Sequence, residues 1–367
     1  MNKIIIKVPT KLMLSGEWAV LEPKSCCISL AINKYVYAEI SQNKKFILLN
    51  FPQININSLQ ATFDCKAKKL LFLDNISTEQ ISKMGFARLS IENSLKFLLS
   101  KNININSFSL AISSGETLIG GQKVGLGSSA AVCVAVVKAI LKIHNQNIVS
   151  QKNLKAIYKI AAISHFQAQG KIGSGYDVAT SVFGKSIIYG KVDERFLKLA
   201  LEQKNIEFLF EKPWPSLFIK SITLPPSMTV NACFCGQSAS TALIVEKINK
   251  FKKEKKDLYF KFVKEIKKVT FDLIQALEAN NQQLVIDLIK ENAKLLSDLG
   301  DASGSGLETK ALKKAIDLST FDNAAGKFSG AGGGDCAIAV TFDKQIADKI
   351  LENWRVNKLI PLDIKIL

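Results

Sequence analysis

The sequence GGQKVGLGSSAAVCVAVVKA, residues Gly120–Ala139, joins a glycine-rich turn to an apolar helical run. Its glycines permit tight-turn backbone conformations, and Ser128 and Ser129 are residue types that favour a helix start. The unpaired N–H groups and partial positive charge of a helix N-terminus attract anions. The stretch therefore predicts a phosphate-binding loop, although the same residues could form a plain turn before a buried helix. Its spacing matches neither GxxxxGK[ST] nor GxGxxG.

Two further stretches narrow the interpretation. One is PTKLMLSGEWAVL (Pro9–Leu21) and the other is FSGAGGGDCA (Phe328–Ala337). Together with GLGSSAA they resemble the three motifs of the GHMP kinase family, in the family's order. The resemblance implies a two-domain α+β fold, with an N-terminal domain like ribosomal protein S5 domain 2, a ferredoxin-like C-terminal domain and an active site between them.

Length and composition agree with a globular protein of two domains. The chain has 367 residues, of which 47% are hydrophobic and 22% charged. We place the domain boundary near residue 205, giving an N-terminal domain over 1–205 and a C-terminal domain over 206–367. The second half ends in a strand–helix–strand pattern after several helices, which is typical of an α+β domain.

The sequence predicts a cytoplasmic protein without a membrane segment. No apolar run reaches about 18 residues, and the start of the chain resembles a first β-strand more than a signal peptide. Seven cysteines without a CxxC pair, and only two histidines, disfavour a zinc site.

The net charge of +17 could indicate a nucleic-acid binder or an enzyme for anionic substrates. The lysines are spread along the chain, and the densest cluster, Lys250–Lys268, alternates with apolar residues at helical spacing. We interpret that cluster as the solvated face of an amphipathic helix. We therefore expect no nucleic-acid partner, and small anionic substrates instead.

Phosphoryl transfer needs a phosphate cradle, a metal ion, a cation near the transferred group and a carboxylate near the nucleophile. By the resemblance, the turn holds the phosphates of ATP, and the hydroxyl of Ser129 is the Mg²⁺ ligand. Both serines could instead be helix caps. The predicted cradle comprises Gly125, Leu126, Gly127, Ser128, Ser129 and Ala130.

The resemblance assigns the catalytic roles to Asp177 and Lys11. Asp177 would assist loss of the proton from the attacking oxygen, and Lys11 would pair with that carboxylate and with the transferred phosphoryl group. From the residues alone, Asp177 could cap a helix over Val178–Val182, and Lys11 could be a solvated charge. The chain has Thr10 where the family usually has glycine.

The resemblance also implies a site for the acceptor between the first motif, the Asp177 loop and the third motif. A tight turn in the third motif and an N-cap at Ser240 are the simpler alternatives. The predicted acceptor-binding residues are Lys11, Glu17, Ser174, Tyr176, Ser240, Ala331 and Gly332.

The stretch KIGSGYDVATSVFG (Lys171–Gly184) looks most like family members that phosphorylate 5-phosphomevalonate. Members that act on mevalonate carry histidine where this chain has Trp18, and a metal-binding glutamate where it has Phe166, beside His165. The implied activity is ATP-dependent formation of 5-diphosphomevalonate in the mevalonate route to isoprenoids, by a monomer or homodimer.

Two alternatives remain open from the sequence. The acceptor could be mevalonate or another small molecule, or the chain could be a non-catalytic binding protein with the same fold. Retention of Lys11, Ser128, Ser129 and Asp177 disfavours the second alternative.

Overall fold

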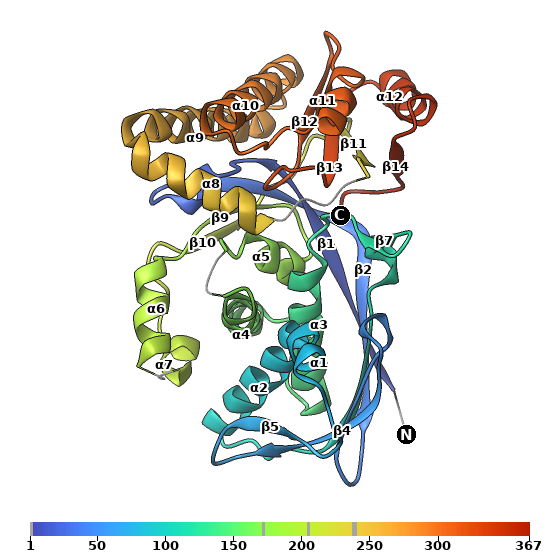
Figure 1. Cartoon of the computed structure of the whole chain (residues 1–367), viewed down its shortest axis with the longest axis vertical. Coiled ribbons are helices and arrows are strands. Elements are labelled where there is room, and N and C mark those ends of the chain that lie inside the picture. The colour runs from blue at the N-terminus through green and yellow to red at the C-terminus, as the bar shows by residue number, and fades with distance from the viewer. Residues whose placement is uncertain (1–2, 171–172, 204–205, 237–240) are drawn as a thin grey trace.

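A long antiparallel pair of strands, β1 (Ile4–Ser15) and β2 (Cys26–Gln42), runs through the centre of the molecule (Figure 1). The computed structural model describes residues 3–170, 173–203, 206–236 and 241–367. The register of the pair shifts between Pro9 and Thr10. Proline lacks the N–H that a regular ladder would use, so an irregularity at this point is expected. The two predicted strands at 3–8 and 11–14 are thus one continuous strand.

The first sheet has the order β10-β9-β2-β6-β3-β4-β5, with β1 beside β2. β3 and β6 run parallel, and the other pairs of this sheet are antiparallel. A small hairpin of β7 (Leu118–Ile119) and β8 (Gln122–Lys123) precedes the phosphate loop. The remaining strands are β3 (Ile47–Phe51), β4 (Ile56–Asp64), β5 (Lys69–Phe72), β6 (Phe108–Ser113), β9 (Ile187–Gly190) and β10 (Phe218–Ser221).

Helices of the first half cover one face of this sheet (Figure 1). The α3 helix is its central element, because α3 packs on β1 and β2 and also on α2, α4 and α5. The α3 sequence is apolar around almost its whole circumference, which is expected of a helix buried on every side. The helices are α1 (Thr78–Lys83), α2 (Gly85–Ser100), α3 (Ser128–Ile143), α4 (Gln151–Ala168), α5 (Tyr176–Phe183), α6 (Glu194–Glu202) and α7 (Ile206–Glu211).

The second sheet has the order β12-β13-β11-β14, and all its pairs are antiparallel. With α8–α11 between β11 and β12, and α12 between β13 and β14, this is the ferredoxin-like βαββαβ pattern. Its elements are β11 (Thr229–Phe234), α8 (Thr241–Glu254), α9 (Lys256–Glu278), α10 (Gln282–Ser303), α11 (Lys310–Asp317), β12 (Ala324–Phe328), β13 (Cys336–Thr341), α12 (Lys344–Val356) and β14 (Ile360–Leu362).

The two halves share apolar contacts. Leu12 and Leu30 of the β1–β2 pair belong to the same buried cluster as Leu273 of α9 and Ile338 of β13. The C-terminal tail returns to the first sheet, where the N–H of Leu367 donates to the carbonyl of Ala31 at 2.9 Å. The upper part of the β1–β2 pair in Figure 1 therefore lies against the second domain.

The α+β class and the two-domain arrangement predicted from the sequence are confirmed. β10 nevertheless pairs with β9 in the first sheet, although it follows residue 205. We therefore propose that the boundary lies between Ser221 and Thr229. The expected last strand over 362–367 is β14 at Ile360–Leu362, followed by an isolated bridge between Ile366 and Ile32.

Candidate active site

The glycine-rich loop wraps around Lys11. The backbone N–H of Lys11 donates to the carbonyl of Leu126 at 3.0 Å, and its ammonium donates to the carbonyl of Gly125 at 3.1 Å. Gly127 has φ +79°, and a Cβ there would lie 2.8 Å from Cε of Lys11. Only glycine satisfies both the left-handed backbone and this close approach. Glycine at position 127 thus leaves room for the side chain of Lys11 in the first motif.

Gly127 is also the N-cap of α3, and its φ/ψ angles are left-handed. Ser128 and Ser129 are the first two residues of the helix, and no side chain caps its start. The capping alternative for the serines is therefore wrong. The hydroxyl of Ser129 lies 3.1 Å from Nε2 of His165 on α4, while Ala130 is buried. The N–H groups of this first turn are available for an anion, as in other phosphate-binding helix starts.

Asp177 is the second residue of α5, whose N-cap is Gly175 with φ +87°. Its Oδ1 accepts the N–H of Val178 at 2.9 Å, and its Oδ2 lies 3.9 Å from Nε2 of His165. Asp177 is therefore inside the helix and is not the cap of 178–182. A carboxylate in the first turn of a helix is favourably placed in the helix dipole.

Lys11, Glu17 and Asp177 act electrostatically on the buried thiol of Cys27. Burial raises the pKa of this thiol well above its ordinary value, the two carboxylates add to that effect, and Lys11 opposes it.

The Lys11 ammonium lies 5.6 Å from the ring centre of Tyr176. Within the described residues no ion pair joins Lys11 to Asp177. The expected direct pairing is thus absent there, and the loop carbonyl of Gly125 accepts from the ammonium instead.

The third motif is fixed to the first motif and to the loop. The N–H of Met13 donates to the hydroxyl of Ser329 at 2.8 Å, and that hydroxyl donates to the carbonyl of Met13 at 3.1 Å. A Cβ on Gly125 would lie 2.5 Å from Cβ of Asp335, so this side chain packs against the phosphate loop. The contacts bring sequence segments more than 300 residues apart into one site.

Residues predicted to bind the acceptor have different environments. Tyr176 reaches the third motif, because its hydroxyl lies 3.8 Å from the Cβ position of Gly330. Ala331 and Gly332 are half-buried in the same turn. The carbonyl of Ser174 accepts the hydroxyl of Tyr189 at 2.5 Å. Ser240 lies outside the described residues.

Glu17 does not face an open site in the structure. Its Oε1 is ion-paired with the ammonium of Lys327, which also donates to the carbonyl of Phe328 at 2.6 Å. Both side chains are fully buried. Burial lowers the pKa of Lys327, and Glu17 opposes that shift. We therefore assign Glu17 a structural role between the first and third motifs in place of the predicted acceptor contact.

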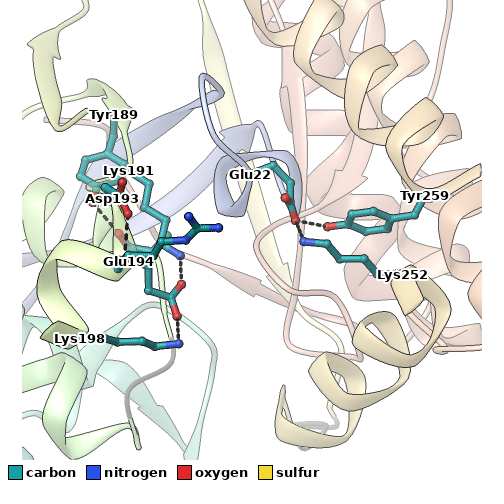
Figure 2. Close-up of polar contacts among 10 residues, drawn as sticks. Glu22, Tyr189, Lys191, Asp193, Glu194, Lys198, Lys252 and Tyr259 are labelled. Atoms are coloured by element: carbon teal, nitrogen blue, oxygen red, sulfur yellow. Dashed lines mark hydrogen bonds and ion pairs between the residues drawn. The ribbon is translucent and has the colours of Figure 1, made fainter. Parts of the chain in front are cut away.

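Trp18, at the position where the resemblance implies a histidine in members that act on mevalonate, is also buried. Trp18 belongs to the same buried apolar cluster as Ile244 and Ile248 of α8. Its backbone has φ +61°, which a non-glycine residue rarely adopts. The neighbouring Glu22 accepts from Lys252 at 2.5 Å and from the hydroxyl of Tyr259 at 2.9 Å, which fixes the first-motif loop to α8 and α9 (Figure 2).

A cleft opens beside the start of α3. It is lined by both serines of the loop, by apolar side chains and by two lysines, a combination that suits the nucleoside and phosphates of a nucleotide. This cleft could not be recognised from the sequence, because Met84 and Phe86 have the helical spacing of ordinary core residues. The lining includes Phe51, Ile54, Lys83, Met84, Phe86 and Lys123.

A smaller crevice is lined by His165 and by other residues of α4. Gly173, Ser174 and Gly175 of the Asp177 loop form one wall, and Lys191 lies in it beside Glu194. The Lys191 ammonium donates to Glu194 at 2.7 Å, and Figure 2 shows this pair at the start of α6.

The chemistry of the donor set at Ser129 fits a water-rich Mg²⁺ site. The side chain offers a hydroxyl oxygen next to the phosphate loop, whereas Phe166 is buried and offers no ligand. No group of three His, Cys, Asp or Glu side chains suited to a metal occurs among the described residues. Mg²⁺ commonly retains several waters and substrate phosphate oxygens, so one protein ligand suffices. Burial lowers the pKa of His165, while Asp177 opposes that shift.

Comparison with known proteins identifies the class. Residues 81–185 match the family described as GHMP kinases N terminal domain, and residues 273–358 match GHMP kinases C terminal. The chain belongs to the GHMP kinase family.

Among individual relatives, phosphomevalonate kinase of Streptomyces sp. (strain CL190) is 24% identical over 98% of this chain and 96% of its own. A Lin0012 protein from Listeria innocua has a TM-score of 0.88 at 30% identity, covering 100% and 99% of the two chains. Streptococcus pneumoniae phosphomevalonate kinase, solved with phosphomevalonate and AMPPNP, has a TM-score of 0.83 at 25% identity, covering 99% and 100%.

Proposed function

We propose that the protein catalyses ATP-dependent phosphorylation of 5-phosphomevalonate, giving 5-diphosphomevalonate and ADP. The observation that carries this proposal is the contact of Lys11 with the Gly125–Ala130 loop, whose Ser129 is linked through His165 to Asp177, in a chain similar over its whole length to phosphomevalonate kinases. We further propose that the enzyme works in the cytoplasm. Among the described residues, no helix combines the length and apolar character needed to span a membrane.

ATP would bind with its base and ribose in the cleft beside α3 and its phosphates on the Gly125–Ala130 loop. The N–H groups of the first turn of α3 would hold phosphate oxygens, and the Lys11 ammonium would stabilise charge that develops on the transferred group. Mg²⁺, held by Ser129, phosphate oxygens and water, would neutralise part of the phosphate charge.

The acceptor would approach from the side of Asp177 and Tyr176. Asp177 accepts the proton that the attacking phosphate oxygen still carries, or assists its loss electrostatically. The phosphate group that the acceptor already carries adds negative charge, which agrees with a net protein charge of +17. The buried position of Trp18 also agrees with an acceptor other than mevalonate, because no histidine is available at that position.

The test is ADP release measured by a coupled assay with 5-phosphomevalonate, mevalonate and homoserine as acceptors. Turnover should depend on 5-phosphomevalonate, with kcat/KM at least about a hundredfold higher than for the other two, since a site built for a phosphate rejects analogues that lack it. Equal or faster turnover of mevalonate would overturn the specific assignment and leave only the family.

A further inference from the structure

The side chain of His165, on α4, lies close to two residues of the candidate active site. One of them is on α3 and the other is on α5. His165 lies near the end of α4 and is 4% exposed. Its Nε2 is 3.1 Å from the hydroxyl of Ser129 on α3 and 3.9 Å from Oδ2 of Asp177 on α5. In the sequence, His165 stands out only as the neighbour of Phe166. In the structure its imidazole connects the loop that would hold ATP with the catalytic carboxylate.

Two sets of contacts hold this imidazole in place: packing of its ring, and hydrogen bonds made by neighbouring residues of α4. Its ring packs on Phe86 of α2, with ring centres 5.1 Å apart and planes tilted by 33°. The rotation of α4 relative to α2 is set by Asn93, whose amide donates to Ser164 at 3.0 Å and to Gln167 at 2.9 Å. His165 lies between these two hydrogen-bonded residues in the sequence. A rigid imidazole can orient a small hydroxyl, which has free rotation of its own.

The other histidine of the chain shows what a purely structural histidine does here. Nδ1 of His144 lies 2.8 Å from the carbonyl of Ile140, and its Nε2 accepts the N–H of Asn106 at 3.0 Å. Both partners of His144 are backbone groups of its own helix and of a nearby loop. The polar partners of the His165 ring are instead side chains of two predicted functional residues.

We propose that His165 is a positioning residue for phosphoryl transfer. Its Nε2 orients the hydroxyl of Ser129 toward the phosphates and Mg²⁺, and its ring holds the carboxylate of Asp177 at a fixed distance from that hydroxyl. This inference rests on the proposed function, because it assigns His165 a part in the same reaction. Misplacing reacting groups by about 1 Å can cost a hundredfold in rate, so one orienting contact can matter without touching the substrate.

Two substitutions separate the effect of the hydrogen bond to Ser129 from the effect of ring packing on Phe86. His165→Phe keeps an aromatic ring against Phe86 and removes the nitrogen. His165→Gln carries an N–H at a similar reach and loses the ring. We expect kcat to fall about 10- to 100-fold for His165→Phe and less than about fivefold for His165→Gln, with KM for ATP changed less than about threefold in both. His144→Gln is the control, and should alter the melting temperature while kcat per folded molecule stays constant.

A double-variant cycle tests whether His165 acts through Ser129. If it does, Ser129→Ala and the double variant Ser129→Ala/His165→Phe should have kcat values within about threefold of each other. A second measurement does not depend on turnover. The rise in melting temperature caused by Mg·AMPPNP over AMPPNP alone should be smaller in His165→Phe than in the wild type, because the Mg²⁺-linked stabilisation depends on an oriented Ser129.

The outcomes distinguish this inference from the proposed function. The wild type is first assayed with all three acceptors, and the variants are then compared on whichever acceptor it uses, so a wrong acceptor does not affect the comparison. Three results would overturn the inference. They are a wild-type kcat in His165→Phe, losses in kcat from Ser129→Ala and His165→Phe that multiply in the double variant, and an unchanged Mg²⁺-dependent shift of the melting temperature in His165→Phe. A loss in His165→Phe that His165→Gln recovers supports the inference.

Discussion

The buried ion pair between Glu17 and Lys327 should stabilise the contact between the first and third motifs. Neither side chain is exposed, so removal of one partner leaves an unpaired group in the protein interior. Breaking a buried pair in this way costs about 3–5 kcal/mol in free energy of unfolding. Lys327→Met is the sharper perturbation, because within the described residues Oε2 of Glu17 already has no hydrogen-bond partner.

The carboxyl group left behind in Lys327→Met can avoid its charge by taking up a proton. From an ordinary pKa of about 4.3, protonation costs about 4 kcal/mol at pH 7 and about 1 kcal/mol at pH 5. The folded variant would then bind a proton that its unfolded chain does not, so its stability falls as the pH rises above about 4.3. The deficit relative to wild type should thus shrink by about 3 kcal/mol between pH 7 and pH 5.

Urea unfolding of wild type and Lys327→Met at pH 5 and pH 7 measures this difference. The double variant Glu17→Gln/Lys327→Met has no charge to bury and should recover most of the loss at pH 7. Lys220→Met removes an exposed pair with Glu278 at 3.1 Å and should cost less than about 1 kcal/mol at both pH values. A deficit in Lys327→Met of equal size at pH 5 and pH 7 would refute the reasoning, since it would come from packing alone.

Three further predictions follow from single positions. Asp177→Asn keeps an acceptor for the N–H of Val178, so the melting temperature should stay within about 2 °C while kcat falls about 10²- to 10⁴-fold; an unchanged kcat would remove Asp177 from the catalytic role. Gly127→Ala should displace Lys11 and lower kcat/KM for ATP. Gly120→Ala, where an added Cβ meets open space, should lower kcat/KM less. Equal losses in the two variants would contradict the argument that a Cβ at position 127 clashes with Lys11. Burial lowers the pKa of Lys138 from 10.5 to about 8, so the unfolded chain binds more protons between these values and this group adds stability as the pH rises from about 8. Melting temperatures at pH 7.5 and 9.5 should show this increment in wild type and not in Lys138→Met.

The local parts of the site were predictable from the sequence. The turn around Gly127 depends on backbone conformations that glycine adopts, and these are visible as glycines in the sequence. Helix α3 follows because its apolar run is long and uninterrupted. The assignment of roles to Lys11 and Asp177 came from the family resemblance, and their catalytic roles remain predictions.

The parts that depend on distant contacts were not predictable. Glu17 and Lys327 are 310 positions apart, and a glutamate in a motif gives no sign that a lysine near the other end of the chain will neutralise it. Strand β12, which carries that lysine, was missed because AAGKF contains glycine and lysine, which have low β-propensity. His165 was overlooked because its partners come from two other helices.

The edge of β1 explains why the three motifs meet. In an antiparallel strand, the N–H groups of residues i and i+2 point to the same edge. The N–H groups of Lys11 and Met13 do so, and their acceptors are the carbonyl of Leu126 in the second motif and the hydroxyl of Ser329 in the third. β2 occupies the opposite edge of β1. An open strand edge invites pairing with another chain, and here both motifs cover it. The first motif therefore serves as the strand on which the phosphate loop and the third motif are aligned, and a change at Lys11 or Met13 that altered the backbone would displace both together.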